Sequence, residues 1–103
     1  MKKALMLAPM GSVHRRFNKA NIDALQELGY TVELCANFEN GEGPERHNDE
    51  YVDKCNRNGI VAHSIPFARH SLTGSLKCLP ELKQLLMNER YHIVPVSYTH
   101  LRA

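Results

Sequence analysis

The feature that most constrains this fold is an apolar run at residues 4–8, which ends at Pro9 and Gly11 and leads into a helical pattern. A strand with few polar residues is typical of a parallel sheet that is covered on both faces. The apolar spacing from Phe17 onward, closed by Gly29, predicts a helix over residues 14–28. We therefore expect a strand-to-helix edge of the kind at which α/β proteins bind ligands.

The rest of the chain repeats this alternation. Strands are expected at residues 30–36 and 60–65, with a fourth opening at 91–94, and the stretch 37–48 is expected to be a surface loop. A short helix is expected at 49–57, and a leucine stripe marks a longer one between residues 72 and 89. Pro80 either lies in the first turn of this helix or kinks an earlier turn. The order predicts an α/β, Rossmann-like three-layer domain with a parallel sheet of about four strands and helices on both faces.

Composition narrows the class of protein. Of 103 residues, 43% are hydrophobic and 23% charged, which is the balance of a soluble globular domain, and the net charge of +2 gives no support to nucleic-acid binding. The three cysteines lie about twenty residues apart without metal-ligand spacing, so neither a metal site nor a disulfide framework is expected. No stretch approaches the roughly twenty apolar residues that cross a bilayer. These features predict a cytoplasmic protein with reduced thiols.

The phosphate-binding fingerprints of such sheets are missing. The turn after the first strand offers Gly11-Ser12 but no P-loop and no G-x-G-x-x-G, and Gly41-Glu42-Gly43 lacks the third glycine. The acids of a receiver domain are also absent from the predicted strand ends. The basic start of the first helix, at His14, Arg15 and Arg16, opposes the helix dipole unless an anion lies there.

Five short segments, taken in their order, carry a family resemblance. They are Met1-Lys2-Lys3-Ala4-Leu5-Met6-Leu7, His14-x-x-Phe17-Asn18, Asn21-Ile22-x-x-Leu25-Gln26-Glu27-Leu28-Gly29-Tyr30-x-Val32, Ile65-Pro66-Phe67 and Leu82-Lys83-Gln84-Leu85. Together they resemble the N-terminal half of a family 4 glycosyltransferase, of the bacterial type that builds capsular or exopolysaccharide repeat units on a lipid carrier. The resemblance covers residues 1–94.

The resemblance implies half of a GT-B enzyme. Such an enzyme has two Rossmann-like domains that face a cleft, transfers a sugar from a nucleotide-sugar co-substrate with retention, and needs no essential metal or other cofactor. The N-terminal domain receives the glycan or lipid-linked acceptor, which implies peripheral contact with the inner face of the plasma membrane. The C-terminal domain holds the donor. This chain ends before that domain, its implied partner, so we expect the fragment alone to be inactive, with unknown catalytic residues.

The resemblance also suggests substrate-binding residues. Gly11 and Ser12 would form the loop that faces the cleft, and His14, Arg15 and Arg16 would meet the diphosphate of a lipid-linked acceptor. A solvated basic helix start is an equal alternative for these three residues. Arg69, just past the third strand, is a further candidate at the same edge. Phe17 is expected to be a core residue rather than a substrate platform.

The end of the chain departs from the family. Where a histidine-containing turn is expected, the sequence continues from Pro95 through Tyr98 to Ala103, and Pro95 removes a ladder donor from a predicted central strand. Residues 95–103 resemble translated adapter read-through. We therefore interpret residues 1–94 as the acceptor-side domain fragment and residues 95–103 as a non-native tail.

A function of another class stays open. The same strand-to-helix edge would suit a stand-alone flavodoxin-like or Rossmann-like module that binds a small anionic ligand. That hypothesis uses the same basic residues and lacks a phosphate fingerprint.

Overall fold

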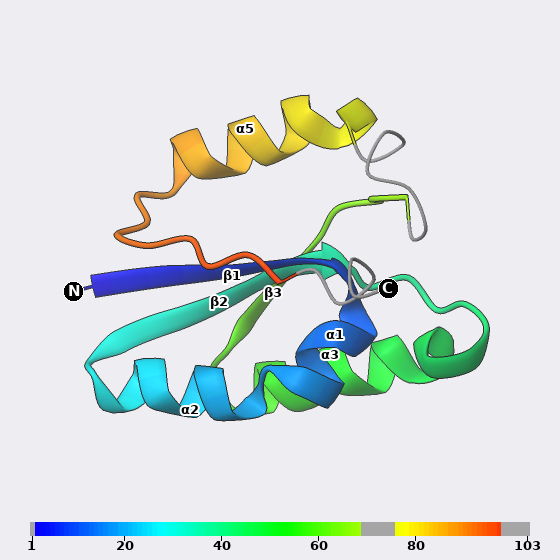
Figure 1. Cartoon of the computed structure of the whole chain (residues 1–103), viewed down its shortest axis with the longest axis horizontal. Helices are drawn as coiled ribbons and strands as arrows, with labels where there is room; N and C mark the ends of the chain where they lie inside the picture. Colours follow the sequence, from blue (N-terminus) through cyan, green and yellow to red (C-terminus); the bar gives the residue numbers. More distant parts are fainter. Residues whose placement is uncertain (1, 69–75, 98–103) are drawn as a thin grey trace.

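The computed structural model describes residues 2–68 and 76–97. Within these ranges the chain forms a three-stranded parallel sheet in the order β1-β2-β3. Figure 1 shows α1, α2 and α3 on one face of the sheet and α5 on the other. The elements are β1 Lys2–Met10, α1 Gly11–Phe17, α2 Lys19–Glu27, β2 Tyr30–Asn37, the 3-10 helix η1 Gly43–His47, α3 Asn48–Arg57, β3 Val61–Ser64, the 3-10 turn η2 Leu76–Cys78 and α5 Leu79–Asn88.

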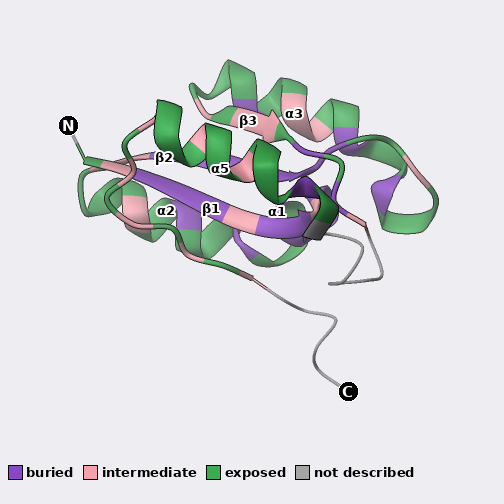
Figure 2. Cartoon of the chain, turned by 90° about the horizontal axis from the view of Figure 1, so that it is seen from above, coloured by how far each residue is buried: buried purple, intermediate pink, exposed green. Residues whose placement is uncertain are grey.

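The apolar run of β1 is explained by its two covered faces, as predicted. Met6 belongs to a buried cluster on the side of α2 and α3, together with Ile22 and Leu34. Leu5 belongs to a second cluster on the side of α5, together with Cys35 and Phe67. Figure 2, which views the chain from above, shows the buried length of β1 passing beneath α5. Side chains alternate between the two faces of a strand, so a strand covered on both faces has no position for a solvated polar residue.

The prediction of one helix over residues 14–28 is wrong, because the helical region begins at Gly11 and is divided into α1 and α2. No loop separates β1 from α1, because β1 extends to Met10 and α1 begins at Gly11. The pairing of β1 with β2 shifts register between Leu7 and Met10. This interval contains Pro9, which has no N–H to donate to the ladder. Asn18 (φ −104°, ψ 2°) then separates α1 from α2. Gly29, at φ 94°, follows the end of α2 and confirms the predicted glycine stop, since positive φ favours glycine.

Two further expectations are settled by the helices. Pro80 lies in the first turn of α5, which begins at Leu79, so the alternative of a kinked turn at Pro80 is wrong. The expected loop 37–48 contains the 3-10 helix η1, which the sequence pattern did not reveal. The beginning of the predicted 72–89 helix lies partly outside the described residues.

The predicted fourth strand is replaced by a segment, residues 92–97, that follows the free side of β1. It forms two isolated parallel bridges, Ala4 with Ile93 and Leu7 with Val96. The amides of Leu5 and Leu7 donate to the carbonyls of Ile93 and Pro95 at 3.1 and 2.8 Å. In a continuous parallel ladder residue 95 would donate to Leu5, and proline cannot. Pro95 therefore accounts for the interruption between the bridges.

Candidate functional site

The predicted site lies at the carboxyl end of β1, where the chain passes directly into α1. Gly11, Ser12 and His14 are all buried there, whereas Arg15 and Arg16 are exposed. Figure 1 places α1 at this end of the sheet, beside the segment that leads from β2 into α3. Arg69 lies outside the described residues. The structure thus brings together the first five predicted residues but divides them into a buried and an exposed group.

The N-terminus of α1 already has an anion, supplied by the protein itself. Glu45 in η1, 33 residues from Ser12 in sequence, accepts a hydrogen bond from the Ser12 amide at 3.1 Å and another from the Ser12 hydroxyl. Asn48 donates its side-chain amide to the same carboxylate at 2.9 Å. A carboxylate is favourable at a helix N-terminus because it accepts from amides that lack helical partners. Ser12 is thus engaged inside the protein. The expected basic helix start is wrong, because His14, Arg15 and Arg16 lie in the last turn of α1, where the helix dipole favours cations.

Gly11 is required by close packing. A Cβ atom on Gly11 would lie 2.7 Å from Cδ1 of Phe38 and 3.0 Å from the side chain of Asn48. The Asn48 carbonyl oxygen that faces this position has no hydrogen-bond partner within the described part of the chain. The glycine thereby lets the start of α1 approach Phe38 and the first residue of α3.

His14 is an internal residue rather than a surface cation. Its ring is fully buried, Nε2 donates to the carbonyl of Cys35 at 3.1 Å, and Nδ1 accepts from the side-chain amide of Asn18 at 3.0 Å. Burial lowers the pKa of His14, and this effect outweighs the hydrogen bond to Cys35, which raises it. His14 is therefore neutral at pH 7 and does not share the surface with the two arginines.

Arg15 and Arg16 form the exposed part of the predicted site. Arg15 donates to the carbonyl of Pro44 at 2.7 Å, and the guanidinium of Arg16 lies 5.2 Å from the ring centroid of Phe17. Phe17 is 51% exposed, so its predicted place in the core is wrong. Phe17 is the last residue of α1. The resulting surface combines two guanidinium groups with an aromatic ring.

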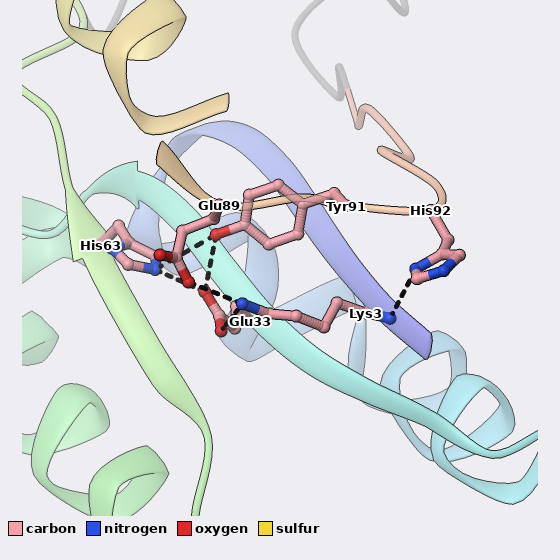
Figure 3. A network of polar contacts seen from close by, with 6 residues as sticks. All are labelled: Lys3, Glu33, His63, Glu89, Tyr91 and His92. Atoms are coloured by element: carbon pink, nitrogen blue, oxygen red, sulfur yellow. Dashed lines mark hydrogen bonds and ion pairs between the residues drawn. The ribbon is translucent and has the colours of Figure 1, made fainter. Parts of the chain in front are cut away.

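A second polar cluster, which the sequence reasoning missed, lies on the α5 face of the sheet (Figure 3). Glu33 of β2, at 7% exposure, accepts from Nε2 of His63 at 2.7 Å and from the Tyr91 hydroxyl at 2.6 Å. Lys3 of β1 lies 3.4 Å from Glu33 and 2.6 Å from Glu89. A glutamate within the otherwise apolar stretch of β2 was the one available signal.

Opposing effects act on the pKa of Glu33 in this cluster. Burial would raise the pKa of Glu33, but hydrogen bonds from Tyr91 and His63 and the charge of Lys3 together lower it. The hydrogen bond to Glu89 is the largest of the effects that raise the pKa of Lys3. The backbone amide of Lys3 also donates to Nδ1 of His92 at 3.1 Å. These contacts join β1, β2, β3 and residues 89–92, and they place the start of the 92–97 segment beside β1.

The described residues contain neither a metal-binding cluster nor a membrane-spanning helix. Within residues 2–68 and 76–97, no group of three or more histidine, cysteine or acidic side chains could hold a metal ion. Among the helices of those same ranges, none has both the length and the apolar character that a bilayer span requires. Comparison of the chain with protein-family models, with curated proteins and with solved structures finds no match.

Proposed function

We propose that this chain is the acceptor-side, Rossmann-like part of a GT-B glycosyltransferase. The parent enzyme would transfer a sugar, with retention, from a nucleotide-sugar donor to a lipid-linked glycan acceptor in polysaccharide biosynthesis. The ordered segments between residues 1 and 85 that resemble family 4 glycosyltransferases support this proposal. A second domain of the same protein would hold the donor, so the chain alone would have no transferase activity.

The observation that carries the proposal is the position of residues 92–94, which precede the tail interpreted as non-native, on the free side of β1. Ile93 bridges to Ala4 there, so the spatial order becomes β3, β2, β1 and then residues 92–94. In doubly wound sheets the chain reverses direction across the sheet between the first and fourth strands, and ligands bind outside the carboxyl ends of the strands at that point. Gly11 and the exposed Arg15 and Arg16 follow the carboxyl end of β1 here.

The residues at this edge take different roles in the proposal. Arg15 and Arg16 would bind the acceptor diphosphate, because a guanidinium group donates in pairs to phosphate oxygens. Gly11 and Ser12 would shape the edge through their contacts with Asn48 and Glu45 rather than bind the acceptor. His14 would support the turn from inside.

Acceptor binding by the full chain tests the proposal. We would titrate the ¹⁵N-labelled chain with N-acetylglucosamine linked to farnesyl diphosphate in detergent micelles, and separately with UDP-glucose and UDP-N-acetylglucosamine. The diphosphate-linked sugar should shift the amides of residues 10–17, and the nucleotide sugars should not. Replacing both Arg15 and Arg16 by Gln should weaken acceptor binding by about tenfold or more.

A matched control removes two exposed arginines elsewhere, Arg57→Gln with Arg90→Gln, and should leave the affinity unchanged. The proposal is wrong if the diphosphate-linked sugar shifts none of these amides, or if both double variants weaken binding equally. Shifts of the same amides by nucleotides alone, or by flavins, would instead support a stand-alone module for a small anionic ligand.

A further inference from the structure

A groove lies between α2 and α3, on the face of the sheet opposite α5. Its volume is about 650 Å³, within the range of roughly 300–1,000 Å³ typical of small-molecule sites. Ile22, Tyr51 and Ile60 line it, and all three also belong to or pack against the core cluster on this face. The groove therefore has an apolar base that is continuous with the core.

The helix faces on either side of this groove are polar. Their lining positions recur every three or four residues along each helix, as the residues of a single helix face do. Where two helices pack directly against each other, such facing rows carry apolar side chains instead. The polar lining residues of the two rows are Arg15, Lys19, Asp23 and Gln26 on one side and His47, Glu50, Lys54 and Asn58 on the other.

The charges along the groove leave a net positive charge. Lys19 pairs with Asp23 at 2.9 Å, and His47 pairs with Glu50 at 3.5 Å, each within its own row. Arg15 uses one of its five N–H donors for the carbonyl of Pro44. Because that acceptor is neutral, the contact does not pair the positive charge of Arg15. Lys54 is exposed and makes no ion pair within the described residues. Three permanent cations thus face two carboxylates.

We propose that this groove binds an acidic sugar, meaning a pyranose ring that carries a carboxylate or a phosphate group. Arg15 and Lys54 would pair with the acidic group. The side-chain amides of Gln26 and Asn58 can donate hydrogen bonds to ring hydroxyls and accept from them, and the Asp23 carboxylate can accept. The apolar base would contact the C–H face of the ring. An amphipathic helix is a poorer fit, because its anchor residues need apolar walls.

This inference does not depend on the proposed transferase role, although Arg15 takes part in both sites. Lys54 belongs to α3 and has no part in the proposed acceptor edge beyond β1. A chain that binds an acidic sugar here would do so whether or not it binds a lipid-linked acceptor. The amides of residues 47–60 distinguish the two, because only the acidic-sugar titration is expected to shift them.

The test is a second NMR titration of the full chain, at an ionic strength of about 20 mM so that surface charges are weakly screened. The probes are tri-galacturonate, which supplies carboxylates, glucose 1-phosphate, which supplies a phosphate, and neutral maltotriose. We expect one or both acidic probes to shift amides within residues 15–26 and 47–60. Maltotriose should bind at least about tenfold more weakly. The acidic probe that binds more tightly identifies the preferred group.

Two charge-matched variants complete the test. Lys54→Gln should weaken acidic-sugar binding by about tenfold, whereas Lys83→Gln, which removes an exposed lysine from α5 on the opposite face, should leave it unchanged. Both lysines are exposed, and the amide spectrum of each variant reports its fold directly. The inference is overturned if no probe shifts these amides, if maltotriose binds as tightly as the acidic probes, or if the two variants have the same effect.

Discussion

Two buried carboxylates connect distant parts of this chain, and they do so in different surroundings. Glu45 lies at the carboxyl end of the sheet, where it accepts from the neutral donors of Ser12 and Asn48. Glu33 lies on the α5 face of the sheet, where the charged Lys3 joins the donors His63 and Tyr91. Glu45 joins the start of α1 to η1, whereas Glu33 joins three strands to the segment that follows α5. The Glu45 contacts therefore form the candidate edge itself, whereas the Glu33 contacts position the segment that lies beside β1.

The largest effect is expected at Glu45. Glu45→Ala leaves the Ser12 hydroxyl and the Asn48 amide without this acceptor in a buried place, and we expect a loss of about 3 kcal/mol in the free energy of unfolding. Urea denaturation followed by circular dichroism measures it. Glu42→Ala, an exposed glutamate just before η1, should change stability by less than about 0.5 kcal/mol. Equal losses in the two variants would contradict the role given to Glu45.

A smaller but more specific effect is expected at Glu33. Glu33→Gln removes the charge that Lys3 faces and weakens the bonds from His63 and Tyr91, for a loss of about 2 kcal/mol. Hydrogen exchange should quicken most at the amides of Leu5 and Leu7, which donate to residues 93 and 95. Asp53→Asn, an exposed residue of α3, serves as the control. Unchanged exchange at Leu5 and Leu7 would show that Glu33 does not hold the 92–97 segment.

The stability of the protein should decrease as the pH falls, through Glu33 and through His14. Because the pKa of Glu33 is lowered on folding, its stabilising contribution is complete above about pH 4.5 and is lost as the pH falls through the lower folded value. The pKa of His14 is also lowered, so its contribution is complete above about pH 6.5 and falls as the pH drops below that value. As the pH falls, the free energy of unfolding should therefore decline first because His14 is neutral in the folded state, and at lower pH because Glu33 loses its charge.

Urea midpoints measured between about pH 7 and pH 5 test the histidine part. His14→Gln should flatten the decline, whereas His47→Gln, which changes an exposed histidine, should keep it. A decline of the same size in the His14 variant would assign it to other groups.

The smallest effect is expected at Pro95. Pro95→Ala restores the N–H that a continuous ladder would direct toward Leu5, and the greater freedom of the unfolded chain offsets part of the gain. We expect stability to change by less than about 1 kcal/mol, with a new exchange-protected amide at position 95. A rapidly exchanging amide there would mean that proline is not the cause of the interrupted pairing.

Some of the candidate site was accessible from the sequence, and some was not. Patterns within about fifteen residues predict the strand before Gly11, the basic positions after it and the exposure of Arg15 and Arg16. The burial of His14 could not be foreseen, because it depends on the Cys35 carbonyl and the Asn18 amide closing around the ring. Helical spacing also gave no sign of the break at Asn18, so Phe17 ends α1 instead of continuing the apolar stripe of α2.

What the sequence determined by itself is the alternation of parallel strands and helices, since apolar periodicity and the glycine stop at Gly29 are properties of neighbouring residues. What only the tertiary structure decided is which polar groups meet. Ser12 and Glu45 lie 33 residues apart, and Glu33 and Tyr91 lie 58 apart. Their pairing depends on strand order, on register and on the path of the chain between elements. Those quantities are set by the packing of the whole sheet, and no local pattern encodes them.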